Sequence, residues 1–197
     1  MKDNHRSIIV FGMARSGTTV FTHVLNQHPH IHLFHNNANY ENDMIFNKKV
    51  EEMEEVISQH PSYRVMFKRP WSESMTDFFV EHMPDAYYLA TLKPFEMINK
   101  SWEKSYWTQG LWGDDDQIRR DKYDKHVALL KNFPLKLKVI DYTKFVSHTD
   151  EVMAEVADFL GLLNYRKVGS EFLPIFDTSF VKSGGDWHFM ESDSNSY

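Results

Sequence analysis

The chain has 197 residues, of which 42% are hydrophobic and 15% aromatic, and its formal net charge is −6. This length suffices for one well-buried core, so we expect a single domain over residues 1–197 with a polar tail at about 190–197. The absence of cysteine excludes disulfides, thiol nucleophiles and cysteine-based metal sites. The acidic balance argues against broad nucleic-acid binding, but a local cluster of cations can still hold a small anion.

The N-terminal segment carries no sign of membrane insertion or export. Residues 1–6 are polar, and the apolar run Ile8–Phe11 is too short for a signal peptide or a membrane span. We therefore expect a soluble, cytoplasmic protein.

Short β-rich runs alternate with segments of helical periodicity along the chain, which predicts an α/β fold with a parallel sheet of about five strands flanked by helices. Ligands of such sheets bind at the C-terminal ends of the strands. The predicted strands are Ser7–Gly12, Ile31–Phe34, Arg64–Lys68, Ala86–Leu92 and Lys136–Tyr142. The predicted helices are Thr18–Gln27, Lys48–His60, Ser72–Met83, Phe95–Tyr106, Gln117–Asn132 and Thr149–Leu160.

The most informative segment joins the first strand to the first helix and reads Gly12-Met-Ala-Arg-Ser-Gly-Thr-Thr19. Its glycines match the phosphate-binding pattern G-x-x-x-x-G-K-[ST], but Thr18 occupies the lysine position and Thr19 the Ser/Thr position. Because that lysine reaches the outer phosphates of a triphosphate, its loss indicates a different phosphate ligand. The backbone N–H groups, both threonine hydroxyls and the fork of Arg15 supply donors for such an anion.

Four histidines, His28, His30, His32 and His35, form the densest histidine group in the chain. Their near-alternate spacing is compatible with a metal site on a strand. No carboxylate accompanies them at ligand spacing, so we do not expect a bound metal.

The loop, followed by a helix and then His28-Pro29, resembles the loop with which sulfotransferases bind the 5′-phosphosulfate end of 3′-phosphoadenosine 5′-phosphosulfate (PAPS). The Arg-Ser-Gly-Thr-Thr form is similar to that of tyrosylprotein and many bacterial sulfotransferases. The resemblance implies a P-loop type of nucleotide site with PAPS as co-substrate. It places five residues at the phosphosulfate: Arg15, Ser16, Gly17, Thr18 and Thr19.

Two further stretches extend this resemblance. The strand Ala86–Leu92 is followed by Lys93, with Ser101 eight positions later, and this pair is similar to an arginine and a serine that contact the 3′-phosphate in the family. Lysine in place of arginine keeps the charge but offers a point contact instead of a fork. The stretch Val65–Pro70 resembles a strand whose lysine, here Lys68, approaches the transferring sulfonate.

The C-terminal part resembles the family less closely. The stretch Val139–Val146 is similar to a family segment that reads Tyr-Glu-Asp-Leu, and it implies a nucleotide contact for Tyr142. The stretch Val181–Trp187 resembles a Gly-Asp-Trp loop that closes over the 3′-phosphate, although it is one residue short and lacks the adjacent arginine. It implies contacts from Lys182 and Gly184. The resemblance spans about residues 7–187.

The resemblance also implies an in-line sulfonate transfer in which cations stabilise charge and a base removes the proton of the acceptor. Related enzymes place a glutamate about six residues after the His-Pro pair, and that position here is His35. Histidine suits this task because its ordinary pKa of about 6.5 lies near neutral pH. The expected catalytic residues are His35, Lys68 and Arg15, with Glu41 as the second candidate for the base.

Two other functions remain open at the level of sequence. A P-loop nucleotide or small-molecule kinase would need a strand-terminal aspartate for magnesium, and Asp141 is the nearest candidate. A non-catalytic binder of PAPS or another nucleotide would have lost its base. The acceptor is a small-molecule, carbohydrate or peptide hydroxyl of unassigned class. Aromatic residues that could line its pocket, or belong to the core, are Trp71, Trp102, Trp107 and Trp112.

Overall fold

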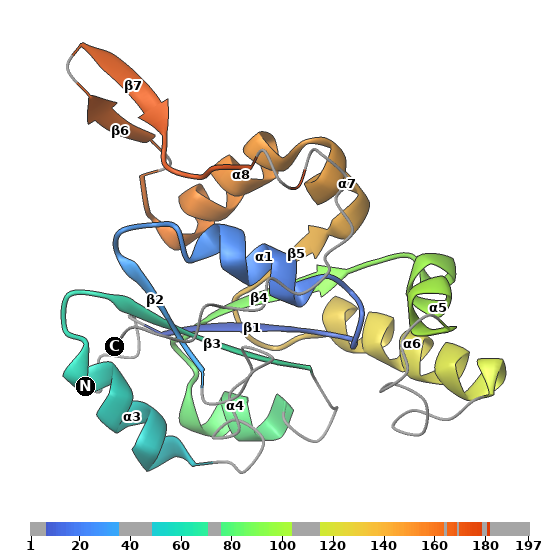
Figure 1. Cartoon of the computed structure of the whole chain (residues 1–197). Coiled ribbons are helices and arrows are strands. Elements are labelled where there is room, and N and C mark those ends of the chain that lie inside the picture. The colour runs from blue at the N-terminus through green and yellow to red at the C-terminus, as the bar shows by residue number, and fades with distance from the viewer. Residues whose placement is uncertain are drawn as a thin grey trace, which may run out of the picture.

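The computed structural model of the chain describes residues 7–35, 49–70, 76–103, 115–163, 165–168, 170–178 and 181. Its centre is a sheet of five parallel strands in the order β2-β3-β1-β4-β5 (Figure 1). The strands are β1 (Ser7–Gly12), β2 (Ile31–Phe34), β3 (Arg64–Pro70), β4 (Tyr87–Leu92) and β5 (Leu137–Asp141). The predicted α/β fold with a parallel sheet is confirmed.

Helices cover both faces of the sheet. One face carries α1 and α8, with α7 beside them, and the other carries α3, α4 and α6 (Figure 1). Within the described ranges, no helix is both long and apolar enough to cross a membrane. The helices are α1 (Thr18–Leu25), α3 (Val50–Gln59), α4 (Thr76–His82), α5 (Phe95–Glu103), α6 (Asp116–Lys131), α7 (Tyr142–Ser147) and α8 (Thr149–Leu160).

The central strand β1 is buried on both faces. Ile8 and Val10 join the core under α1 and α8, whereas Ile9 and Phe11 join the core under α3, α4 and α6. Side chains of a strand alternate between the two faces of a sheet, so a strand covered on both sides reads as one apolar run. This is why the four consecutive residues Ile8–Phe11 are all apolar.

The loop after β1 lies where the connections of the sheet change face. After β1 the chain forms α1 on one face of the sheet. The two strands beside β1 are followed by other helices: β3 by α4, and β4 by α5 and α6. Of these, α4 and α6 pack on the opposite face. Such a reversal opens a crevice at the carboxyl end of the sheet, where ligands of open α/β folds bind.

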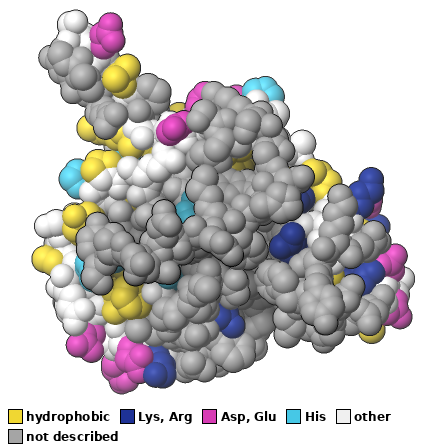
Figure 2. Space-filling view, in the orientation of Figure 1, with side chains coloured by type: hydrophobic (Ala, Val, Ile, Leu, Met, Phe, Trp, Pro, Cys, Tyr) yellow, Lys and Arg dark blue, Asp and Glu magenta, His cyan; other side chains and the backbone are white. Residues whose placement is uncertain are grey.

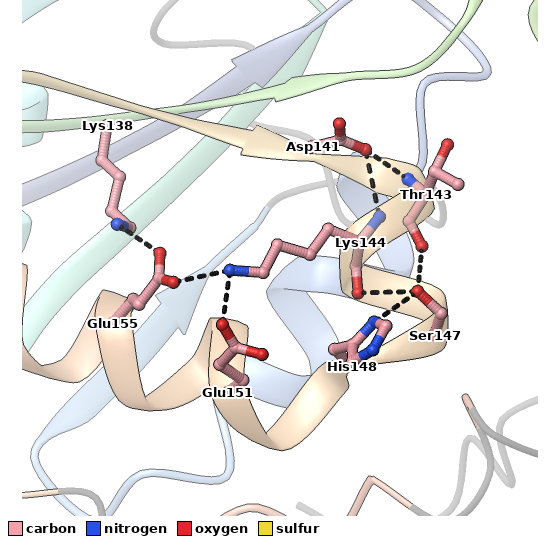
Figure 3. A network of polar contacts seen from close by, with 8 residues as sticks. All are labelled: Lys138, Asp141, Thr143, Lys144, Ser147, His148, Glu151 and Glu155. Carbon is pink, nitrogen blue, oxygen red and sulfur yellow. Dashed lines mark hydrogen bonds and ion pairs between the residues drawn. The ribbon is translucent and has the colours of Figure 1, made fainter.

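The fifth strand ends one residue earlier than predicted, and a short helix follows it. Asp141 Oδ1 accepts hydrogen bonds from the N–H groups of Thr143 and Lys144, at 2.7 and 3.0 Å. This carboxylate cap starts α7, so Tyr142 opens a helix instead of closing a strand. In Figure 3, Lys144 also pairs with Glu151 and Glu155 of α8, which links the two helices.

A small antiparallel hairpin, β6 (Tyr165–Val168) and β7 (Glu171–Pro174), was not predicted. It extends away from the five-stranded sheet beyond α8 (Figure 1). The end of α8 that precedes it agrees with the sequence, because Gly161 follows the helix with a φ of 65°.

Candidate functional site

The loop between β1 and α1 contains two residues in the left-handed region, Arg15 with a φ of 71° and Gly17 with a φ of 93°. The Ser16 N–H donates to the carbonyl of Met13 at 3.0 Å, which closes a turn. Gly17 stands at the N-cap of α1, and no described side chain caps the helix there. The N–H groups of the first helical turn, together with this curved backbone, therefore form an anion-binding nest.

Arg15 holds a backbone conformation that suits glycine better than arginine. The left-handed region costs a non-glycine residue about 1–2 kcal/mol, and such strain persists where the surroundings fix it. Arg15 Nε donates a hydrogen bond to Ser101 Oγ of α5 at 3.0 Å. The strained loop thus carries the guanidinium to a helix that begins beyond β4.

The loop is locked to the end of β4 by a pair of hydroxyls. Ser16 Oγ and Thr91 Oγ1 share a buried hydrogen bond of 2.7 Å. A Cβ atom on Gly12 would lie 2.5 Å from Ser16 Oγ and 2.6 Å from Thr91 Oγ1, so only glycine permits this approach. Thr91 was not among the predicted site residues.

Tyr142 joins the loop to Lys93. A Cβ atom on Gly17 would lie 2.3 Å from Cε2 of the Tyr142 ring, and Lys93 Nζ lies 4.3 Å from the centroid of the same ring. Burial and the charge of Arg15 lower the pKa of Lys93, and burial lowers the pKa of Arg15. We call Arg15, Lys93, Ser101 and Tyr142 the arginine flank of the loop.

The loop also rests on an apolar contact with α5. Met13 packs with Ile98 and Trp102, and the Trp102 side chain is only 3% exposed. Trp102 therefore belongs to the core, and its alternative interpretation as a wall of the acceptor pocket is not supported. The contact fixes the helix that presents Ser101.

On the other side of the loop, Lys68 of β3 lies level with Val10 of β1 and is 1% exposed. Met66, two positions earlier, belongs to the core beneath α1, so alternation directs Lys68 to the same face. In β2, Ile31 and Leu33 face the same core, and alternation again carries His35 to the α1 face.

His23 of α1 belongs to the same region. Burial lowers the pKa of His23, and the charges of Lys68 and His35 lower it further. These electrostatic interactions place the three side chains near one another although they come from three elements. We call His23, His35 and Lys68 the histidine flank. Sequence reasoning missed His23, and the available signal was its position four residues after Thr19 on the first helix.

The remaining histidines of the predicted cluster are held in other contacts. His28 Nδ1 accepts a hydrogen bond from the His30 N–H at 3.1 Å, so His28 Nε2 carries the proton and donates to the Leu163 carbonyl at 2.9 Å. The ring of His32 stacks on that of His60 with centroids 4.3 Å apart. Within the described ranges, no three metal-ligating side chains are grouped as a metal site.

The two flanks differ in the side chains that they present. In Figure 2, Lys and Arg side chains are visible over α5 and α6 and also near α3, and histidine side chains are visible on the side of β2 and also near α7. Thr18 and Thr19 open α1 at the nest between the flanks. Six residues considered from the sequence lie outside the described residues: Glu41, Trp71, Trp107, Trp112, Lys182 and Gly184.

No protein-family model and no curated protein sequence matches this chain. Among solved structures, a sulfotransferase from Alicyclobacillus acidocaldarius is 18% identical with a TM-score of 0.57, over 87% of this chain and 84% of that one. Sulfotransferase STF1 from Mycobacterium tuberculosis is 14% identical with a TM-score of 0.57, over 90% and 75%.

A sugar kinase from Janibacter sp. is similar to a comparable degree, at 12% identity and a TM-score of 0.53, over 80% of this chain and 95% of that one. At these identities the likeness concerns the fold alone. The chain therefore has a sulfotransferase-like α/β fold that a sugar kinase also shares.

Proposed function

We propose that this protein is a sulfotransferase that moves a sulfonate from PAPS to a hydroxyl or amine acceptor by in-line displacement. The observation that carries the proposal is the hydrogen bond from Arg15 Nε to Ser101 Oγ, with Lys93 close enough to interact electrostatically with Arg15. It joins the anion-binding loop to the two residues that the family resemblance assigns to a 3′-phosphate. Two anion-binding groups next to one another suit a nucleotide that carries phosphate at both its 3′ and 5′ positions.

The donor set fits the proposed co-substrate. The nest and the hydroxyls of Thr18 and Thr19 suit the 5′-phosphosulfate, and Lys93 and Ser101 suit the second phosphate. Lys68, buried beneath α1, supplies a positive charge where negative charge grows on the sulfonate and the leaving phosphate. A preorganised cation in a site with little water stabilises such charge far more than it would in bulk solvent.

In the proposed reaction, the acceptor oxygen or nitrogen forms a bond to sulfur while the bond between sulfur and the 5′-phosphate oxygen breaks. The leaving phosphate keeps the electron pair of that bond, and the proton of the acceptor passes to a base. The base assigned from the sequence is His35, which belongs to the histidine flank with Lys68. The chemistry then takes place on the side of the loop away from Lys93 and Ser101.

A kinase is the second candidate, because a sugar kinase is among the similar structures and is covered over 95% of its length. A kinase of this fold needs a carboxylate for magnesium near the loop. The two strands beside β1 instead end in Lys68–Pro70 and in Thr91 and Leu92, and Lys93 follows the second of them. The carboxylate of Asp141 is engaged as the cap of α7. These features favour sulfonate transfer over phosphoryl transfer.

Nucleotide-dependent thermal stabilisation tests the proposal. Adenosine 3′,5′-bisphosphate without magnesium should raise the melting temperature, and a ligand at a hundred times its Kd adds about 2.7 kcal/mol of stability. Adenosine 5′-phosphate, which lacks the 3′-phosphate, is the matched control and should stabilise less. Stabilisation by ATP with magnesium alone would favour the kinase instead.

A transfer assay then separates an enzyme from a non-catalytic binder. Radiolabelled sulfonate from PAPS should appear on at least one acceptor from a panel of carbohydrates, phenols, tyrosine peptides and aliphatic alcohols. Tight binding of the bisphosphate with no transfer to any member of the panel would favour a binder that lacks a working base.

A further inference from the structure

The histidine flank contains a residue to which the family resemblance gives no role. We propose that His23, in place of the His35 assigned from the sequence, is the proton acceptor of the transfer reaction, and that His35 is its neighbour in the histidine flank. This proposal rests on the proposed function and names a catalytic residue for it. Three observations carry it: the place of His23 on α1, the direction of Lys68, and the contacts that occupy His28, a further histidine just beyond the end of α1.

His23 lies on the same side of α1 as Thr19, which belongs to the first turn of the helix. Residues four apart in an α-helix stand one above the other, so His23 is aligned with Thr19 at the nest. The neighbours of His23 on α1, Thr22 and Val24, are fully buried against the sheet, whereas His23 is half-buried. A half-buried imidazole at the edge of the packed face can meet a substrate and later release its proton to water.

The sheet brings a buried cation to this imidazole. α1 packs across β1 and β3, and alternation along β3 turns Lys68 toward α1. The last residue pair between β2 and β3 is Phe34 with Phe67, and His35 and Lys68 are the residues that follow this pair in the chain. His23, His35 and Lys68 therefore lie near one another where α1 approaches the ends of β2 and β3.

The charges around His23 suit it to accept a proton. Burial, Lys68 and His35 lower the pKa of His23, which favours the neutral ring at pH 7, the form that acts as a base. An anion bound in the nest offsets the charge of Lys68. The pKa of His23 should then rise, and the base gains proton affinity when the co-substrate is present.

The proton balance is simple. The proton leaves the acceptor hydroxyl for the imidazole nitrogen of His23 as the acceptor oxygen bonds to sulfur, and the leaving 5′-phosphate keeps the electron pair of the broken bond. The imidazolium then loses the proton to solvent. His28 is unsuited to this step because it is 2% exposed and hydrogen bonds engage both of its ring nitrogens.

The test compares His23→Gln with His35→Gln in the full-length protein, with the exposed His30→Gln as the control. We expect His23→Gln to lower kcat about a hundredfold or more and to leave the KM for PAPS nearly unchanged. It should also abolish the acidic limb of the kcat profile, which is the fall of kcat at low pH caused by protonation of the base. We expect His35→Gln to keep that limb, and His30→Gln to behave as the unmodified protein.

A second readout does not depend on turnover. Histidine side-chain NMR should show the titration midpoint of His23 rising when adenosine 3′,5′-bisphosphate binds, and also rising in Lys68→Met without nucleotide. Bound nucleotide with an unchanged His23 midpoint, or a His23→Gln variant that keeps its acidic limb, would overturn the role of His23 and leave the proposed function standing. A protein that binds no bisphosphate at all would overturn both.

Discussion

The two flanks of the loop after β1 are built differently, although both surround an anion-binding nest. The arginine flank consists of cations held by fixed contacts: Arg15 on Ser101, and Lys93 over the ring of Tyr142. The histidine flank combines a buried cation, Lys68, with the imidazole side chains of His23 and His35. Fixed cations are suited to hold an anion, whereas proton transfer needs groups that titrate. In the proposed reaction, nucleotide binding and proton transfer would therefore take place on opposite sides of one loop.

The topology of the sheet explains this division. β4 and β5 lie on one side of β1 and supply Lys93 and Tyr142 at their ends, whereas β3 and β2 lie on the other side and supply Lys68 and His35. A ligand that spans the crevice therefore meets both flanks. Substitutions on the two flanks should change different kinetic constants.

The largest effect is expected for Lys68→Met, which removes the buried cation of the histidine flank and keeps an apolar side chain of similar length. We expect kcat for sulfonate transfer to fall about 10²–10³-fold, because a charge that stabilises the transition state is lost. The affinity for adenosine 3′,5′-bisphosphate should fall far less. A variant with unchanged kcat and strongly weakened nucleotide binding would contradict the division between the flanks.

Gly17→Ala tests the contact between the loop and Tyr142. The substitution strains a φ of 93° and places a Cβ atom against the Tyr142 ring, and we expect a loss of about 2–4 kcal/mol in the free energy of unfolding. Gly161→Ala is the matched control, because its φ is 65° and a Cβ atom there would meet nothing within 4 Å. It should cost about 1 kcal/mol. Equal losses in urea unfolding would show that the ring contact is unimportant.

Arg15→Gly separates the charge of the arginine flank from its backbone strain. Glycine accepts the φ of 71°, so the free energy of unfolding should change by less than about 1 kcal/mol. The affinity for the bisphosphate should fall about tenfold or more, because a charged hydrogen-bond donor is lost. Calorimetric titration measures this change.

A double-mutant cycle of Arg15→Gly with Ser101→Ala then measures how far the two residues act as one unit. Their hydrogen bond predicts losses of affinity that are clearly less than additive. Additive losses would mean that each residue contacts the nucleotide independently.

Much of the fold and the arginine flank could be predicted because the signals are local. The periodicity of apolar residues, the turn residues and a short loop pattern located β1, α1 and the residues Arg15 to Thr19. The pairing of Lys93 with Ser101 came from family resemblance. Their interactions with Arg15 could not be predicted in this way, since these depend on a left-handed backbone and on the packing of Met13 against α5.

The histidine flank was harder to predict because register and helix orientation create it. The sequence does not state that β3 lies between β2 and β1, and this order places the strand that carries Lys68 beside the strand that precedes His35. His23 became visible only when α1 was placed across β3. The helix α7 was missed for a local reason: Asp141 ends a strand and caps a helix with the same carboxylate.

The smallest effect concerns a buried histidine outside both flanks, whose pKa differs between the folded and the unfolded chain. His126 of α6 packs edge-on against Phe11 beneath β1, and burial lowers its pKa to about 4. The unfolded chain binds the proton first as pH falls below about 6.5, so stability decreases with falling pH over the interval between the two pKa values. From pH 7.5 to pH 6, His126 should lower the free energy of unfolding by about 0.8 kcal/mol.

His126→Leu should remove this component of the pH dependence of stability. No described residue accepts or donates a hydrogen bond at His126 Nε2, so an apolar side chain of similar size should leave stability at pH 7 unchanged or raise it. Urea unfolding at pH 7.5 and pH 6 measures the difference. The acidic limb of kcat should survive in His126→Leu, because that limb belongs to the histidine flank. Loss of the limb in this variant would show that it reports the stability of the fold rather than the base of the reaction.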